Sequence, residues 1–245
     1  MHEYGKNPAL SYNEYLRVPE LVNLQTSLSE PTSHDELLFI IIHQTYELWF
    51  KQILHEIDAS INWLNEGRMF RANHSLRTVT AIEKIMVSQI HILESMAQIG
   101  FLEFRDKLNP ASGFQSMQFR ELEFVSGAKD EKILNFFEFD EFAHQRLEQR
   151  FNAPTLADTF WKLLETKDFD VSNEDARVET IVKILEKPEK FPELFTMQDL
   201  LIEHDENISL WRYHHVLMVE RMLGMKREQR FQKNSFPNFG KRERI

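Results

Sequence analysis

Apolar residues recur every three or four positions over most of this 245-residue chain. The clearest run extends from His34 to Leu64, and its apolar members are Leu37, Leu38, Ile41, Leu48, Ile53, Ile57 and Ile61. This spacing follows the 3.6-residue turn of an α-helix and predicts one long amphipathic helix.

Similar patterns predict further helices on both sides of this run. The first is expected from Leu10 to about Leu28, with Pro19 as a kink or break, and a new element starts at Pro31. Another helix is expected at 70–96, with Gly100 as the cap after its end. The stretch from Phe101 contains a loop at 109–113 and then continues as a helix through Glu123. Several shorter amphipathic helices fill the stretch between residues 127 and 192, with interruptions at 152–154 and 168–173. The last helix is expected from Phe195 to Leu223, because Gly224 follows it and Arg221 lies in its final turn.

The composition supports this helical pattern. The chain contains only 7 Gly and 8 Pro, whereas turn-rich all-β folds use more of both. The chain is also long enough to bury a substantial core. We therefore expect an all-α fold in which residues 1–245 form a single helical-bundle domain.

Cysteine content and charge exclude several kinds of site. The chain has no Cys, which rules out disulfides, thiolate zinc sites, iron–sulfur clusters and thiolate-ligated haem. Its formal charge of -10 argues against nucleic acid and anionic membranes as partners, because both attract basic surfaces. No apolar stretch approaches the about 18 residues of a membrane span. Residues 1–4 show no apolar signal core, so we expect a cytoplasmic protein.

His43 is the first candidate for chemistry. It follows the apolar run from Leu38 to Ile42 and lies one helical turn after Phe39, on the same face. On this pattern alone, His43 is either a buried structural histidine or a residue of a pocket.

Other metal and catalytic motifs are incomplete. A di-iron bundle needs two Glu-x-x-His pairs and two further glutamates, and only Glu141 and His144 have that spacing. The H-E-x-x-H, Walker, G-x-G-x-x-G and Gly-x-Ser-x-Gly motifs are all missing. In the last predicted helix, His214 and His215 point about 100° apart, so only one can face a given partner. A neutral imidazole can ligate haem iron, and without cysteine a histidine is the expected protein ligand.

Three blocks together resemble the tryptophan 2,3-dioxygenases. They are SEPTSHDELLFIIIHQTYELWFKQILHE at 29–56, FLEFRDKLNPASGFQSMQFR at 101–120 and LWRYHHVLMVERMLG at 210–224. The likeness covers residues 12–224 and is weakest at 127–200. It implies an all-helical homotetramer with one haem b per subunit, which adds dioxygen to L-tryptophan and gives N-formylkynurenine in the kynurenine pathway.

The resemblance also implies roles for individual residues. His215 would be the axial ligand of the haem iron, because the family places its ligand fourth after the tryptophan that here is Trp211. His43 would bind the indole N–H, and Phe39 would pack against the ring. Arg105 would bind the substrate carboxylate, and a guanidinium suits that group because it can donate two parallel hydrogen bonds.

Further positions follow from the same blocks. Phe101 occupies a position that is Tyr or Phe in the family, and Ser112 would stand near bound dioxygen. Tyr12 and Tyr15 resemble a pair that reaches into the pocket of a neighbouring subunit. The remaining members of the expected substrate-binding segment are Ile40, Ile41 and Ile42.

The chain departs from the family pattern after Gly224. The family continues into a Gly-Thr-Gly-Gly loop that contacts the substrate and closes over the pocket, whereas this chain continues MKREQRF. Losing such a loop would weaken binding, slow turnover or change the substrate. The alternatives to a tryptophan dioxygenase are a related haem protein for another indole or aromatic amino acid, a non-catalytic haem-binding protein, and a helical oligomer without cofactor.

Overall fold

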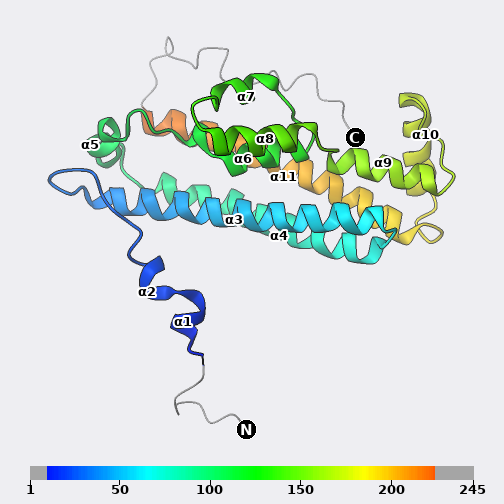
Figure 1. Ribbon diagram of the computed structural model, residues 1–245, viewed down its shortest axis with the longest axis horizontal. Helices are drawn as coiled ribbons and strands as arrows, with labels where there is room; N and C mark the ends of the chain where they lie inside the picture. The colour runs from blue at the N-terminus through cyan, green and yellow to red at the C-terminus, as the bar shows by residue number, and fades with distance from the viewer. Residues whose placement is uncertain (1–9, 224–245) are drawn as a thin grey trace, which may run out of the picture.

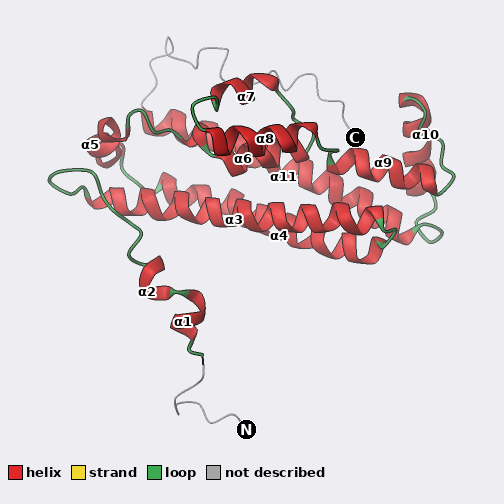
Figure 2. Ribbon diagram, viewed as in Figure 1, coloured by secondary structure: helices red, strands yellow, loops and turns green. Residues whose placement is uncertain are grey.

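The structure is a computed structural model that describes residues 10–223, and helices alone form its regular elements in that range. The predicted all-α class is confirmed (Figure 2). Three long helices form the body: α3 (His34–Asn65), α4 (Met69–Glu94) and α11 (Pro192–Leu223). α3 and α4 form an antiparallel hairpin, and α11 packs along α4 (Figure 1).

The shorter helices surround this body. They are α1 (Tyr12–Leu16), α2 (Val18–Leu21), α5 (Gln98–Leu108), the 3-10 helix η1 (Gly113–Gln115), α6 (Met117–Val125), α7 (Glu131–Phe136), α8 (Glu141–Asn152), α9 (Leu156–Thr166) and α10 (Glu174–Leu185). α5, α6 and α9 pack on α3, and α8 packs on α6. α1 and α2 project away from the helical body (Figure 1).

The long hairpin follows from local sequence signals. Asp35 and Glu36 lie in the first turn of α3, where negative charge is favoured by the helix dipole. Gly67 follows the helix with a φ of +72°, a left-handed conformation that glycine adopts without strain. The prediction of one helix from His34 to Leu64 is therefore confirmed to within one residue.

The buried face of α3 differs from part of the predicted apolar stripe. Ile53 and Ile57 are fully buried in the core, as an amphipathic helix requires. Leu37, Ile41 and Leu48, however, are 48%, 42% and 56% exposed in the single chain. The first half of α3 thus presents a second apolar face that none of residues 10–223 covers.

The predicted helix from Leu10 to Leu28 is wrong in its extent. The structure has two short helices that meet at Arg17, whose φ is +51°, and helical structure ends at Leu21. Pro19 has no N–H to donate to the carbonyl of Tyr15, so one helix cannot continue through it, whereas proline is tolerated in the first turn of α2. Beyond Leu21, the chain is held by side-chain contacts instead, including the bond from the Gln25 amide to Gln44 at 2.7 Å.

Gly100 does not end the helix before it, as the sequence suggested. α4 ends at Glu94, and Gly100 lies inside α5. A Cβ atom at position 100 would overlap the carboxylate of Asp35. Glycine avoids this overlap, which arises because α5 approaches the start of α3 closely.

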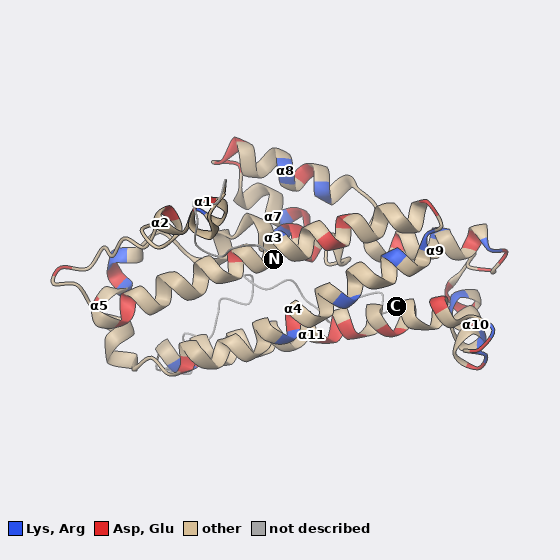
Figure 3. Cartoon of the chain, turned by 90° about the horizontal axis from the view of Figure 1, so that it is seen from below, with Lys and Arg blue, Asp and Glu red and all other residues tan. Residues whose placement is uncertain are grey.

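Most buried side chains form one core between α3, α4, α11 and the helices packed on them. A smaller cluster joins α6, α7 and α8 through Phe124, Phe137, Ala143 and Leu147. Basic and acidic residues are intermixed along the helices (Figure 3). Within residues 10–223, no single helix has the length and apolarity to cross a membrane, and α4 with α5 qualifies only as a pair bent by 103°.

Candidate functional site

A cavity of about 720 Å³ lies between α3, α5, α6 and α11. This volume is within the range of about 300–1,000 Å³ that is typical of cofactor and ligand sites. The wall is mainly apolar, and its aromatic members are Phe39, Tyr46, Phe50, Phe101, Phe114, Phe119 and Trp211. Residues from the first long helix and the last one therefore share one cavity.

Six of the predicted site residues line this cavity together. Phe39 and His43 come from α3, Phe101 and Arg105 from α5, Ser112 from the loop before η1, and His215 from α11. Phe39 and His215 are 176 positions apart in the chain, so tertiary packing brings these residues together.

The ring of His43 is fixed in one orientation. Its Nδ1 lies 2.7 Å from the carbonyl oxygen of Phe39, and only a protonated nitrogen can donate to that acceptor. Burial lowers the pKa of His43 below its usual value of 6.5 and outweighs the opposing effects of this hydrogen bond and of Glu47. His43 is therefore neutral at pH 7, with Nε2 left as an acceptor.

His215 is a second neutral imidazole in the cavity wall. Burial, followed by the charges of His43 and Arg212, lowers the pKa of His215 to about 4. Its ring stacks on Trp211, with the centroids 5.3 Å apart. A deprotonated ring nitrogen is the form that binds a metal ion.

The neighbouring His214 points elsewhere. Its ring lies 5.9 Å from that of His91, and it is not part of the cavity wall. The expectation that only one of the two adjacent histidines faces a given partner is confirmed.

The α3 and α5 walls of the cavity form an aromatic group. The ring centroid of Phe39 lies 4.0 Å from that of His43, 5.9 Å from that of Phe101 and 5.4 Å from that of Phe104. Phe104 is fully buried behind the cavity wall and supports the other two rings. This surface suits a flat aromatic ligand.

A buried charge network lies in the wall near α11. Glu123 is 1% exposed and accepts hydrogen bonds from Arg120 at 2.5 Å and from Arg212 at 2.6 Å. Both arginines line the cavity. The sequence alone does not indicate this network, although Arg212 lies one helical turn before His215 and Glu123 lies one turn after Arg120.

The polar residues on the open side of the cavity are less buried. Arg105 and Ser112 are exposed. Ser112 caps η1, where its Oγ accepts from the backbone N–H of Phe114 at 3.3 Å. Its hydroxyl proton is still available to donate.

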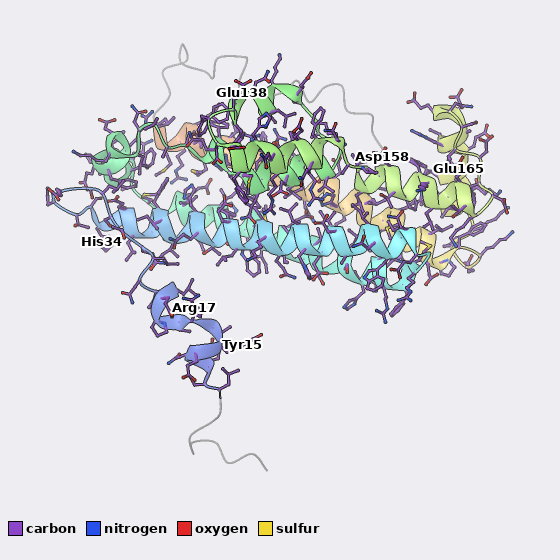
Figure 4. All side chains as sticks on the ribbon, viewed as in Figure 1. Tyr15, Arg17, His34, Glu138, Asp158 and Glu165 are labelled. Carbon is purple, nitrogen blue, oxygen red and sulfur yellow. The ribbon has the colours of Figure 1, made fainter. Side chains whose placement is uncertain are left out.

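Five predicted substrate-binding residues do not line the cavity. Ile40, Ile41 and Ile42 lie on other faces of α3, and Ile42 is part of the core. Tyr12 and Tyr15 are 74% and 72% exposed on α1, and Tyr15 projects away from the helical body (Figure 4). Within a single chain, these five residues therefore do not complete the site.

A metal cluster of the di-iron kind is not formed by the described residues. Within 10–223, no three His, Asp or Glu side chains are grouped so that they could hold a metal ion. Glu141 and His144, the one pair with di-iron spacing, lie on α8 outside the cavity.

Fold and cavity together define a class: an all-helical protein with a largely apolar cavity lined by two neutral histidines. The family described as tryptophan 2,3-dioxygenase matches residues 2–167. A tryptophan 2,3-dioxygenase from Nocardioides sp. is 46% identical over 91% of this chain and 86% of its own length. A tryptophan 2,3-dioxygenase from Herpetosiphon aurantiacus is 43% identical over 89% of this chain and 87% of its own length. One from Myxococcus xanthus is 34% identical over 88% of this chain and 79% of its own length. The chain belongs to the tryptophan 2,3-dioxygenase family.

Proposed function

We propose that this protein is a haem-dependent dioxygenase that opens the indole ring of L-tryptophan to N-formylkynurenine, in the kynurenine pathway. The observation that carries the proposal is the cavity in which Phe39, His43, Arg105 and His215 meet. These residues come from separate blocks of the chain, and each has the chemistry that this substrate or cofactor needs.

His215 is the proposed axial ligand of one haem b per subunit. Its imidazole is neutral because its pKa is lowered to about 4, and Trp211 fixes the plane of the ring by stacking. The apolar aromatic wall of the cavity suits a flat macrocycle. Haem, when bound, supplies the iron chemistry that activates dioxygen.

The residues of α3 and α5 are proposed to hold the substrate. Phe39 and Phe101 offer aromatic surface to the indole ring, and Nε2 of His43 accepts a hydrogen bond from the indole N–H. Arg105 binds the carboxylate. Ser112 is proposed to donate its hydroxyl proton on the dioxygen side. Together these contacts orient the ring and exclude water.

We further propose a homotetramer in which α1 reaches a neighbouring subunit. The exposed Tyr12 and Tyr15, and the uncovered apolar side chains of Leu37, Ile41 and Leu48, support this assembly because large exposed apolar surfaces mark interfaces. Light scattering after size exclusion would measure the mass, and a monomer would contradict this part of the proposal. A cytoplasmic location stays a prediction.

The activity is tested with purified protein, haemin, a reductant, L-tryptophan and air. We expect N-formylkynurenine to accumulate. A normal haem spectrum without product would refute the activity and favour a haem-binding protein without turnover. Failure to take up haemin would refute the cofactor as well.

The haem ligand is tested separately, by haem retention. His215→Ala should lose haem, whereas His43→Ala should keep it. His214→Ala is a matched control because that ring is directed towards His91 rather than the cavity. Full haem retention in His215→Ala would show that the ligand assignment is wrong.

A further inference from the structure

Most charged side chains of the cavity wall already have partners within the chain. Glu123 binds both Arg120 and Arg212, as described above. Glu47 accepts a hydrogen bond from the Gln118 amide at 2.8 Å. These groups therefore satisfy one another before any ligand enters.

Arg105 and Asp106 are different. Both line the cavity, both are exposed, and neither side chain forms a hydrogen bond or ion pair with another described residue. They are consecutive on α5, so their side chains diverge by about 100° and do not neutralise each other. A cation and an anion are thus left side by side at the mouth of the cavity.

The position of Asp106 is not explained by helix stability. It lies in the last turn of α5 (Gln98–Leu108), where the helix dipole disfavours negative charge. Arg105 and Lys107 lie in the same turn, but within the described residues no ion pair joins either of them to Asp106. A ligand that carries positive charge would provide this compensation.

The part of α5 before these two residues is held firmly. Gly100 packs directly against Asp35, and the Ser33 hydroxyl donates to Glu103 at 2.9 Å. Because α5 is anchored to the start of α3 in this way, the backbone at 105–106 has a defined place at the rim.

We propose that Asp106 binds the ammonium group of the amino-acid substrate whose carboxylate binds Arg105. In an α-amino acid, the two charged groups are attached to one carbon atom, so a matching site needs opposite charges close together but not paired. Arg105 and Asp106 meet this requirement. The inference rests on the proposed function for the role of Arg105, and it makes Asp106 a specificity-determining residue that selects zwitterionic ligands.

Glu47 is the other carboxylate in the wall and fits this role less well. It lies on α3, one turn after His43, whose pKa it raises through its charge. Its Oε2 already accepts from Gln118. Asp106 is both adjacent to Arg105 and without a partner in the described part of the chain.

The test compares L-tryptophan with indole-3-propionate, which keeps the ring and the carboxylate but lacks the ammonium. Each ligand is titrated into the reduced, haem-loaded protein, and its dissociation constant is read from the haem absorption spectrum. In Asp106→Asn, the constant for L-tryptophan should rise about tenfold, the size of one lost charge-assisted hydrogen bond. That for indole-3-propionate should not rise.

Lys107→Gln is the matched control, because it changes the charge of the same helical turn by one unit at a residue that does not line the cavity. It should bind both ligands as the unchanged protein does. Equal weakening of both ligands in Asp106→Asn would show a merely structural role, and unchanged L-tryptophan binding would show no role; either result overturns the inference. If the unchanged protein bound indole-3-propionate but not L-tryptophan, the inference would again be wrong. Binding of neither ligand would instead refute the proposed substrate and the inference with it.

Discussion

Replacing Glu123 by glutamine tests whether the buried charge network stabilises the cavity wall. The carboxylate is 1% exposed, and its partners Arg120 and Arg212 are 10% and 13% exposed. Glutamine keeps the shape but offers one acceptor oxygen and a donor amide, so one guanidinium would face a donor. Removing one partner of a buried ion pair costs about 3–5 kcal/mol.

The structure places Glu123→Gln toward the lower end of that range. Arg120 keeps a second acceptor, the carbonyl of Phe114 at 3.3 Å, and the glutamine oxygen can still serve one arginine. We therefore expect the free energy of unfolding to fall by about 3 kcal/mol. At about 2–4 °C per kcal/mol for a chain of this size, the melting temperature should fall by roughly 6–12 °C.

The assay is urea unfolding of the haem-free protein, followed by circular dichroism. Lys84→Gln is the control, because Lys84 and Glu203 form an ion pair whose side chains are 60% and 33% exposed, and such pairs contribute about 1 kcal/mol or less. A loss of under about 1 kcal/mol in Glu123→Gln would refute the reasoning, because it would mean that water reaches the network in solution.

Two further predictions concern α5 and the pH. Gly100→Ala should destabilise the fold by about 1–3 kcal/mol through overpacking against Asp35. It should also weaken L-tryptophan binding, because α5 carries Arg105. If overpacking is the cause, adding Asp35→Ala to Gly100→Ala should restore both stability and binding. The haem-free protein should lose stability as the pH falls, because the unfolded chain protonates His215 near 6.5 and the folded chain only near 4. From pH 7 to pH 5 this group alone removes about 2 kcal/mol. Urea titrations at both pH values measure the loss, and an equally large loss in His215→Gln would contradict the assignment.

The helices that are long and periodic were predictable from the sequence. α3 and α11 begin and end within about three residues of the predicted positions, because their limits depend on local signals such as glycine and the charge of the terminal turns. Gly224, the predicted signal for the end of α11, lies outside the described residues. So does the segment MKREQRF, which follows it in place of the family loop. Helix breaks at 152–154 and 168–173 were also predicted correctly.

Two of the failures involve contacts that are not visible in the local sequence. In the sequence, Gly100 resembles a signal for the end of a helix. In the structure, glycine fits at this position because a larger residue would overlap the carboxylate of Asp35 on another helix. The residues after Leu21 leave the helix because Gln44 and Glu36 offer hydrogen bonds that local propensity does not contain. Such partners become visible only when the chain is folded.

The site residues also divide into those that the sequence indicates and those that only the folded structure reveals. Phe39, His43, Arg105, Ser112 and His215 were found through resemblance in three blocks, and the structure brings them into one cavity. Glu123 was missed because a buried glutamate on a short helix has no sequence signature of its own. Its importance follows from the two arginines that it joins.

The cavity draws its walls from α3 near the start of the chain and from α11 near the end of the described residues. A molecule bound there connects helices that are distant in sequence and is released when either one detaches. Its binding free energy therefore adds to the unfolding free energy of the whole helical body, by about 2.7 kcal/mol when the free ligand is at 100 times its dissociation constant. Occupancy should thus govern how quickly proteases degrade the protein, and abundance in the cell would follow the supply of ligand.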